Sequence, residues 1–183
     1  MAKLVLALVT IFALLAAGSG RELLQSKTVT GTAAATPSLS ILVEALTTAN
    51  LTGTLDDPNL VATVFAPTND AFAALLKQLN YTEAQLLSSY ILKPTLLYHV
   101  VPGVAAKSMD LTNGQQLPTL LKGSNLTVAL MMGGVNIEGA ASNGTVTMPN
   151  IAADKAVVHV IDTVLLPASS VLDTYKPAPS TRR

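Results

Sequence analysis

The sequence contains no cysteine and no tryptophan, and only 4% of its 183 residues are aromatic. Without cysteine, disulfides and thiolate metal sites are excluded. Charged residues are also sparse, at 12%, and 11 basic residues balance 11 acidic ones. This balance provides no electrostatic basis for binding nucleic acid or an anionic membrane surface. We therefore expect neither of these as a partner.

Histidine is scarce as well, with His99 and His159 as its two occurrences, both in apolar segments. A metal site would require both of them to converge with an acid such as Asp162. A serine hydrolase of the elbow type would need a G-x-S-x-G motif, which is missing. Buried, hydrogen-bonded histidines are the simpler interpretation. The sequence thus predicts a protein that is not an enzyme and needs no metal or cofactor.

Half of the residues are hydrophobic, which is enough for the core of one domain. Part of this excess lies at the N-terminus, where Lys3 precedes an apolar run over 4–17 and small residues follow up to Gly20. This pattern predicts a signal peptide over 1–20, because the run is shorter than the roughly 20 residues of a membrane span. An uncleaved anchor is the alternative. The polar end "YKPAPSTRR" predicts no lipid anchor, so we expect secretion to the extracellular space or cell wall.

Four asparagines match the N-x-[ST] acceptor pattern for N-linked glycans, and each is followed by threonine: Asn50, Asn80, Asn125 and Asn143. In a eukaryotic host these are predicted glycosylation sites. In a bacterial host the pattern carries no such meaning.

The pattern along the rest of the chain predicts helices in the first half. A flexible leader is expected over 21–36, and a first helix is expected to begin at Thr36-Pro37. The run 60–66 is typical of a buried strand. A capping box formed by Thr82 and Gln85 starts a later helix. Its predicted buried side consists of Leu86, Leu87, Tyr90 and Ile91.

The second half is predicted to form mostly antiparallel strands. Turns are expected at Asn113-Gly114, Lys122-Gly123, Gly133-Gly134 and Asn143-Gly144. A long apolar strand then ends at Pro167, and a flexible polar tail is expected over 169–183. This segregation of helices from strands indicates an α+β domain.

The stretch "TVFAPTNDAF" at 63–72 predicts a corner between a strand and a helix. Pro67 ends the strand because it has no N–H to donate. Thr68 is placed to cap the helix, and Asp70 falls in the first turn, where the helix dipole favours a negative charge. Pro67 and Phe72 occupy the positions of a hydrophobic staple. Building the corner accounts for every residue type here without a catalytic role.

Together with "LLYHVVPG" at 96–103 and "VVHVIDTVLLP" at 157–167, this stretch resembles the three signature segments of the fasciclin domain, in the same order and spacing. The resemblance covers 37–168. It implies a compact β-sandwich or wedge with several helices packed at one end. It also implies an extracellular adhesion, matrix or cell-wall module that acts through contacts with proteins or glycans. The motif residues, which we expect to be mainly structural, are Phe65, Pro67, Thr68, Asp70, Phe72, Tyr98, His99, His159, Asp162 and Pro167.

Two features leave alternatives open. Tyr98 and His99 have been linked to receptor contact in members of the family that the chain resembles. A single domain without an anchor is also a poor bridge between cells, and some algal members of that family bind carotenoids. The alternative function is therefore a secreted carrier of an apolar small molecule such as a carotenoid. Its candidate pocket residues are Met131, Met132 and Val135, because methionine adapts to flexible apolar ligands.

Overall fold

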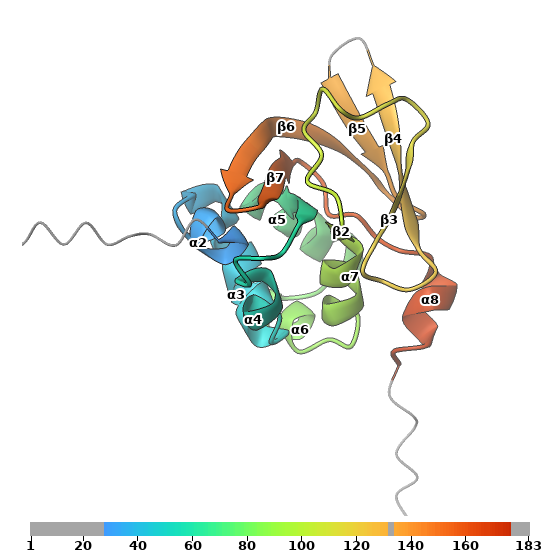
Figure 1. Cartoon of the computed structure of the whole chain (residues 1–183). Coiled ribbons are helices and arrows are strands. Elements are labelled where there is room, and N and C mark those ends of the chain that lie inside the picture. The colour runs from blue at the N-terminus through green and yellow to red at the C-terminus, as the bar shows by residue number, and fades with distance from the viewer. Residues whose placement is uncertain (1–27, 132–133, 177–183) are drawn as a thin grey trace, which may run out of the picture.

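The computed structural model describes residues 28–131 and 134–176 (Figure 1). Several predictions concern residues outside this range: the signal peptide, residues 21–27 of the leader, Met132, Gly133 of the predicted turn and the last seven residues of the tail. Among the described residues, no helix has the length and apolar character required to cross a membrane.

Most helices precede most strands, as the sequence predicts. The helices are α2 (Val29–Ala34), the 3-10 helix η1 (Pro37–Leu39), α3 (Ser40–Thr48), α4 (Thr52–Leu55), α5 (Asn69–Leu79), α6 (Glu83–Leu87), α7 (Leu92–Tyr98) and α8 (Ser169–Asp173). The strands are β1 (Ala62–Pro67), β2 (Val100–Pro102), β3 (Gln116–Pro118), β4 (Asn125–Met131), β5 (Gly134–Glu138), β6 (Asn143–Ala153) and β7 (Ala156–Ile161).

The seven strands form one sheet in the order β2-β1-β7-β6-β5-β4-β3. Neighbours are antiparallel except β1 and β7, which run parallel with Phe65 opposite His159. The two ends of the sheet approach each other, since Leu120 N, just after β3, donates to Val100 O in β2 over 2.8 Å. The sheet is therefore nearly closed, and the predicted α+β fold is confirmed.

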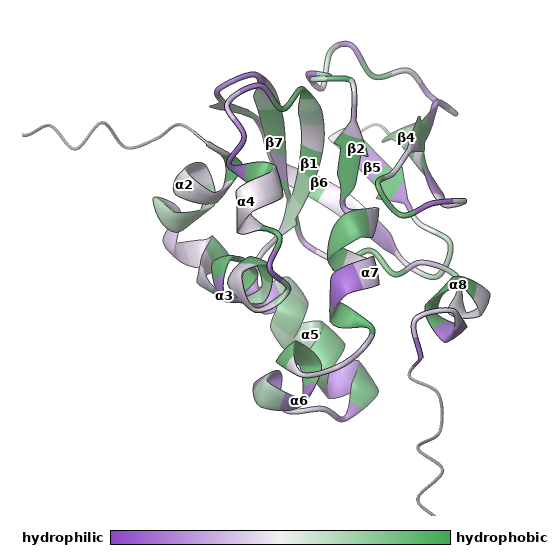
Figure 2. Cartoon of the chain, turned by 60° about the horizontal axis from the view of Figure 1, so that its bottom comes forward, coloured by the Kyte–Doolittle hydropathy of each residue, from purple (hydrophilic) through white to green (hydrophobic). Residues whose placement is uncertain are grey.

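Two hydrophobic clusters meet at β1. The first lies between the helices and one face of the sheet, and it includes Val64 and Ala66. The second fills the space inside the curled sheet and includes Phe65. Because successive side chains of a strand point to opposite faces, β1 is buried on both sides. This explains why its sequence is almost wholly apolar, as Figure 2 shows for β1 and β7.

An irregular segment of β6 lets the sheet curl. The first residues of β6 pair with β5, whereas Val146–Ala153 pair with β7, with register shifts on both sides of Met148. Asn150 lies in the second of these shifts and has a φ of 63°. Bulges of this kind bend a strand and increase its twist.

The structure differs from the predicted flexible leader over 28–36, the part of 21–36 that it describes. Helix α2 begins there, with Thr28 Oγ1 accepting from Gly31 N over 3.2 Å. Val29 and Ala33 are 3% and 1% exposed and pack in the first cluster. The sequence VTGTAA has a weak helix propensity because of its β-branched residues and glycine. Tertiary packing stabilises this helix instead.

Two further predictions about elements were wrong. Asn143-Gly144 does not form a turn but opens β6, where Gly144 pairs with Ile137. A Cβ on Gly144 would lie 3.3 Å from Thr163 O, so this glycine permits close packing. In the predicted flexible tail, Ser169–Asp173 form the short helix α8.

Candidate functional site

The three motif segments form one continuous site at one end of the strand order, on β2, β1 and β7. Strand β1 lies between β2 and β7, and each of these strands belongs to a different motif. Phe65 N donates to His99 O over 2.9 Å, and Thr68 N donates to Ile161 O over 3.1 Å. The motif residues therefore contact one another although they are far apart in the sequence.

His99 lies at the end of α7 and is 2% exposed. Its Nδ1–H donates to Thr95 O over 2.7 Å, and its Nε2 accepts from Leu165 N over 2.9 Å. This pair of partners fixes a neutral ring with the proton on Nδ1. Burial lowers the pKa of His99 to about 4, against a smaller opposing effect of the Thr95 carbonyl. His99 thus ties α7 to the segment after β7.

His159 lies in β7 and is also buried. Its Nε2–H donates to Ala106 O over 3.0 Å, and its Nδ1 accepts from Asn150 N over 3.3 Å. Its ring stacks on Phe65, with centroids 5.7 Å apart and planes 25° apart. Burial lowers its pKa, while the Ala106 carbonyl raises it to a lesser extent. His159 therefore holds the bulge of β6 and the loop after β2.

Tyr98 is 0% exposed, so neither it nor His99 presents a side chain at the surface. The Tyr98 hydroxyl donates to Asn125 O over 3.0 Å and accepts from Ala140 N over 2.9 Å. Burial raises the pKa of Tyr98, and the Ala140 N–H opposes this shift. In this conformation other residues cover the Tyr98 and His99 side chains, so a receptor could contact only those covering residues.

The corner at the end of β1 has the predicted caps. Thr68 Oγ1 accepts from Ala71 N over 3.3 Å, and Asp70 is exposed in the first turn of α5. Pro67 and Phe72 are both buried on the two sides of the cap, as expected for a staple.

Sequence reasoning missed two polar residues of this site. Asn69 bridges α5 to the start of α3, since its Oδ1 accepts from Ile41 N over 3.1 Å and its Nδ2 donates to Pro37 O over 3.1 Å. Thr63 is buried, donates to Val104 O over 2.7 Å and accepts from Ala106 N over 2.9 Å. The signal for Thr63 was a lone polar residue in an apolar strand.

The structure does not bring the histidines together with an acid. Asp162 is exposed, and its Oδ1 accepts from Thr145 N over 2.8 Å and from Thr163 Oγ1 over 3.0 Å. Within 28–131 and 134–176, no three metal-ligating side chains form a group that could hold an ion. Pro167, the last motif residue, is buried at the end of the domain.

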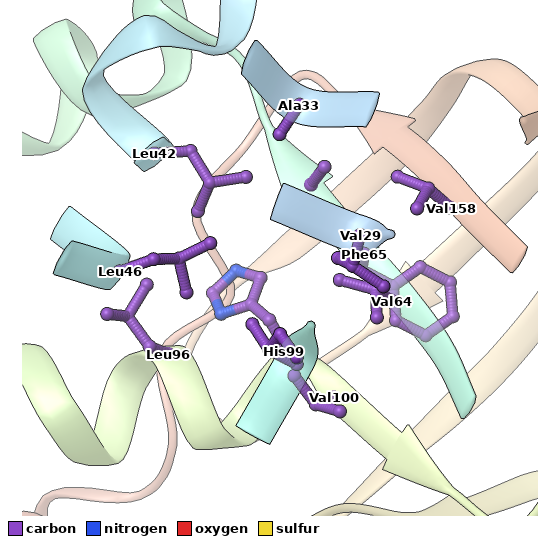
Figure 3. A pocket seen from close by; sticks show the side chains of 12 residues that line it. Val29, Ala33, Leu42, Leu46, Val64, Phe65, Leu96, His99, Val100 and Val158 are labelled. Atoms are coloured by element: carbon purple, nitrogen blue, oxygen red, sulfur yellow. The ribbon is translucent and has the colours of Figure 1, made fainter. Parts of the chain in front are cut away.

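An apolar pocket lies between the helices and the sheet. It is lined by Val29 and Ala33 of α2, Leu42 and Leu46 of α3, and residues of α4, α7, β1, β2 and β7. Figure 3 shows the His99 ring among these aliphatic side chains. The volume open to the centre of a water-sized sphere is about 10 Å³, which is room for one water molecule at most.

The residues that the sequence suggested for a ligand pocket lie elsewhere. Met131 is at the end of β4 and is 61% exposed. Val135 is partly buried against the second cluster. Neither lines the pocket beneath α2, and Met132 is outside the described residues.

All four asparagines of the glycosylation pattern are exposed. Asn50 and Asn80 follow α3 and α5 and have φ angles of 55° and 53°. Asn125 begins β4 and Asn143 begins β6. All four positions are open to modification from solvent.

Known proteins share this sequence pattern. A model of the Fasciclin domain matches residues 37–167. Two proteins of Synechocystis sp. are each 37% identical to the chain. The first, the uncharacterized protein sll1735, matches over 127 residues, 69% of this chain and 88% of its own. The second, protein sll1483, matches over 142 residues, 76% of this chain and 73% of its own.

Fasciclin-1 of Schistocerca americana is 28% identical over 123 residues, which cover 64% of this chain and 18% of the insect protein. The solved structure of a FAS1 domain pair from the insect cell adhesion molecule Fasciclin I superposes with a TM-score of 0.69 at 21% identity. That match covers 79% of this chain and 52% of the pair, so the chain spans about half the length of the insect structure. At this identity the likeness concerns the fold.

Proposed function

The chain belongs to the fasciclin domain family, and from that membership we propose that it is a secreted, non-enzymatic interaction protein acting as an adhesion, matrix or cell-wall module. Fasciclin domains are generally non-catalytic adhesion modules. One observation about the site supports the proposal most. Three buried motif residues form side-chain hydrogen bonds with backbone groups of the domain: Tyr98, His99 and His159.

This use of hydrogen bonds argues against acid-base chemistry at the motif residues. A general base needs a free lone pair within reach of the substrate. Each histidine instead has one nitrogen that donates to a carbonyl and one that accepts from an N–H. The motifs therefore build the domain, and recognition is left to the surface.

Two properties of the chain support a role outside the cell. The balanced charge gives no electrostatic basis for strong binding to nucleic acid. The four exposed asparagines provide sites for glycans in a secretory pathway. We propose extracellular proteins or glycans as the partners.

The proposal is tested on the protein purified from its own source. We expect an N-terminus after Gly18 or Gly20, recovery from the extracellular fraction, and saturable retention on extracellular matrix or cell-wall material. Heat-denatured protein is the control for nonspecific retention. An intracellular protein that retains Met1 would contradict secretion, and a folded protein that shows no retention would contradict the interaction role.

The alternative, a carrier of an apolar small molecule such as a carotenoid, is supported by the apolar lining of the pocket beneath α2. Pockets for small molecules usually measure roughly 300–1,000 Å³, against about 10 Å³ here. A carrier function would therefore require α2 to move away. Native intact mass before and after solvent extraction tests it. An extractable mass with an absorption band favours a pigment carrier, and sugar mass alone favours the interaction module.

A further inference from the structure

An open groove lies at the helical end of the molecule, around α6. It is lined by Tyr81, Gln85, Ser88, Ser89 and Tyr90. The centre of a water-sized sphere can occupy a volume of about 330 Å³ in it. Figure 1 shows α6 at the bottom of the view, with the β4–β5 hairpin at the top. The groove is distinct from the motif site and from the pocket beneath α2, because none of its five lining residues belongs to either.

Both tyrosines of the groove are exposed, and for Tyr90 this differs from the sequence prediction. Tyr90 was predicted on the buried side of the helix that starts at Thr82, but α6 ends at Leu87. Leu86 remains buried, whereas Tyr81 is 43% and Tyr90 is 41% exposed. Two of the four tyrosines in the chain therefore line one hollow in contact with solvent. Exposed aromatic side chains grouped in this way are typical of binding surfaces.

The polar groups between the tyrosines are uncharged, and one of them is held in place. Gln85 Oε1 accepts from Thr82 N over 2.8 Å in the capping box, which fixes the carboxamide. Its Nε2 has no hydrogen-bond partner among residues 28–131 and 134–176, so its N–H groups are available to a ligand.

The two serines add one hydroxyl that can accept a hydrogen bond and one that can donate one. Ser88 Oγ donates to Ala84 O over 2.8 Å, which leaves its lone pairs to accept. Ser89 Oγ accepts from Ile91 N over 3.4 Å, which leaves its proton to donate. The groove therefore combines two aromatic rings with neutral donors and acceptors.

We propose that this groove binds a neutral sugar. A pyranose ring has an apolar C–H face, which suits an aromatic ring, and a rim of hydroxyls, which suits amide and hydroxyl side chains. An ionic ligand would require a countercharge, which the five lining residues lack. A purely apolar ligand would leave the carboxamide and hydroxyls unpaired at a cost. The inference deepens the proposed function, because it names a ligand class and a site for an interaction protein.

The sugar has two possible sources. Asn80 is exposed, lies directly before Tyr81 and is one of the four predicted glycosylation sites. A glycan on Asn80 would start at the rim of the groove. A separate polysaccharide chain outside the cell presents the same chemistry.

The first arm of the test titrates the unglycosylated chain with chitotriose, mannotriose or cellotriose and records amide NMR shifts. We expect saturable shifts in residues 81–90 with at least one trisaccharide. Tyr81→Ala or Tyr90→Ala should weaken binding about tenfold or more, as truncation of a central aromatic contact does. Tyr175→Ala is the matched control, because Tyr175 is 41% exposed but lies after α8. This result identifies a separate sugar as the ligand.

The second arm uses the chain secreted by yeast and compares the rates at which an endoglycosidase removes glycans from Asn80 and Asn50. Asn50 is the matched control, because it also follows a helix with a positive φ. Slower release at Asn80, accelerated severalfold by Tyr81→Ala, identifies the protein's own glycan as the ligand. If Asn80 carries no glycan, the first arm alone decides.

The proposal is overturned if no trisaccharide shifts residues 81–90 and Asn80 shows no protection that depends on Tyr81. It is equally overturned if only a protein partner shifts these residues. In both cases, retention on extracellular material that persists in the Tyr81→Ala and Tyr90→Ala variants would leave the proposed function standing. The two failures are therefore distinguishable.

Discussion

His99 and His159 are bound in opposite tautomers, and each ring nitrogen faces a backbone group. In His99 the proton is on Nδ1, and in His159 it is on Nε2. A second proton on either ring would point at an N–H donor, from Leu165 or Asn150. The folded state therefore disfavours both charged histidines, in agreement with their lowered pKa values.

From this we predict a domain that loses stability in mild acid. Above pH 6.5, the ordinary histidine pKa, both states are neutral and the stabilisation is complete. Between pH 6.5 and about 4, the pKa of folded His99, the unfolded state binds a proton that the folded state does not. The free energy of unfolding should fall by up to roughly 1.4 kcal/mol per pH unit from His99, and the lowered pKa of His159 acts in the same direction.

Urea unfolding between pH 7.5 and 5 measures this effect, because most carboxyl groups titrate at lower pH. A His99→Asn variant should be less stable but should depend less steeply on pH. Equal stability of the unmodified protein at pH 7.5 and pH 5 would show that the histidines are not held neutral.

The Tyr98 hydroxyl provides a second prediction for a single residue. Tyr98→Phe leaves Asn125 O and Ala140 N without this partner at a partly buried position. Loss of one partner of a fully buried hydrogen bond costs about 1–3 kcal/mol, so at this position we expect a loss of about 1 kcal/mol. Urea unfolding should show this loss, while Tyr175→Phe at the surface should change stability by less than about 0.5 kcal/mol. Unchanged stability together with lost partner binding would assign Tyr98 to recognition instead.

The corner between β1 and α5 could be predicted from sequence because its interactions are local. Thr68 caps over three residues, and Thr82 and Gln85 form their box over the same spacing. Such contacts depend on residue type and spacing alone. Asn69 was missed because its partners, Pro37 and Ile41, lie about thirty residues away.

We predict that Thr68→Ala lowers the free energy of unfolding by about 1 kcal/mol, because the first turn of α5 loses its side-chain acceptor. Thr68→Ser retains the hydroxyl and serves as the control, with a much smaller change. Thermal or urea unfolding measures both variants. A Thr68→Ala protein with normal stability but no partner binding would reverse the structural interpretation of the motif.

Elements that depend on tertiary contacts were predicted less well. Helix α2 has a weak local signal and is formed because Val29 and Ala33 are buried in the first cluster. Gly144 looked like a turn residue, but its role is set by Thr163 and Leu165 across the sheet. Tyr90 was predicted to be buried because helical periodicity was extended past Leu87, where α6 ends.

For the whole molecule, composition and patterning predicted the α+β class, and the three motifs predicted the family. The order of the strands was beyond local reasoning, because β1 pairs with β7 across most of the domain. The groove around α6 was missed for the same reason, since local periodicity placed Tyr90 in the core. Surface sites depend on which side chains the finished fold leaves exposed.

The family match begins at residue 37, but the packing indicates a folding unit that includes α2 and its cap Thr28. A chain shortened to 37–176 exposes the surface that Val29 and Ala33 cover in the full domain. Relative to 28–176 it should lose on the order of 3 kcal/mol, or roughly 10 °C in Tm. Calorimetry of both chains measures the difference. Equal melting temperatures would show that α2 is dispensable.

The parallel pairing of β1 with β7 also has a kinetic consequence. Thr63 lies opposite Val157, about half the chain length away, and β1 can join β6 only through β7. Contacts between such distant segments slow folding, because a long loop must close before they form. During synthesis the helices and β1 emerge first, and the β1 edge that pairs with β7 and the Phe65 face of β1 stay uncovered until the last strand has left the ribosome. A nascent chain stalled before residue 156 should therefore bind chaperones, and one released at residue 176 should fold.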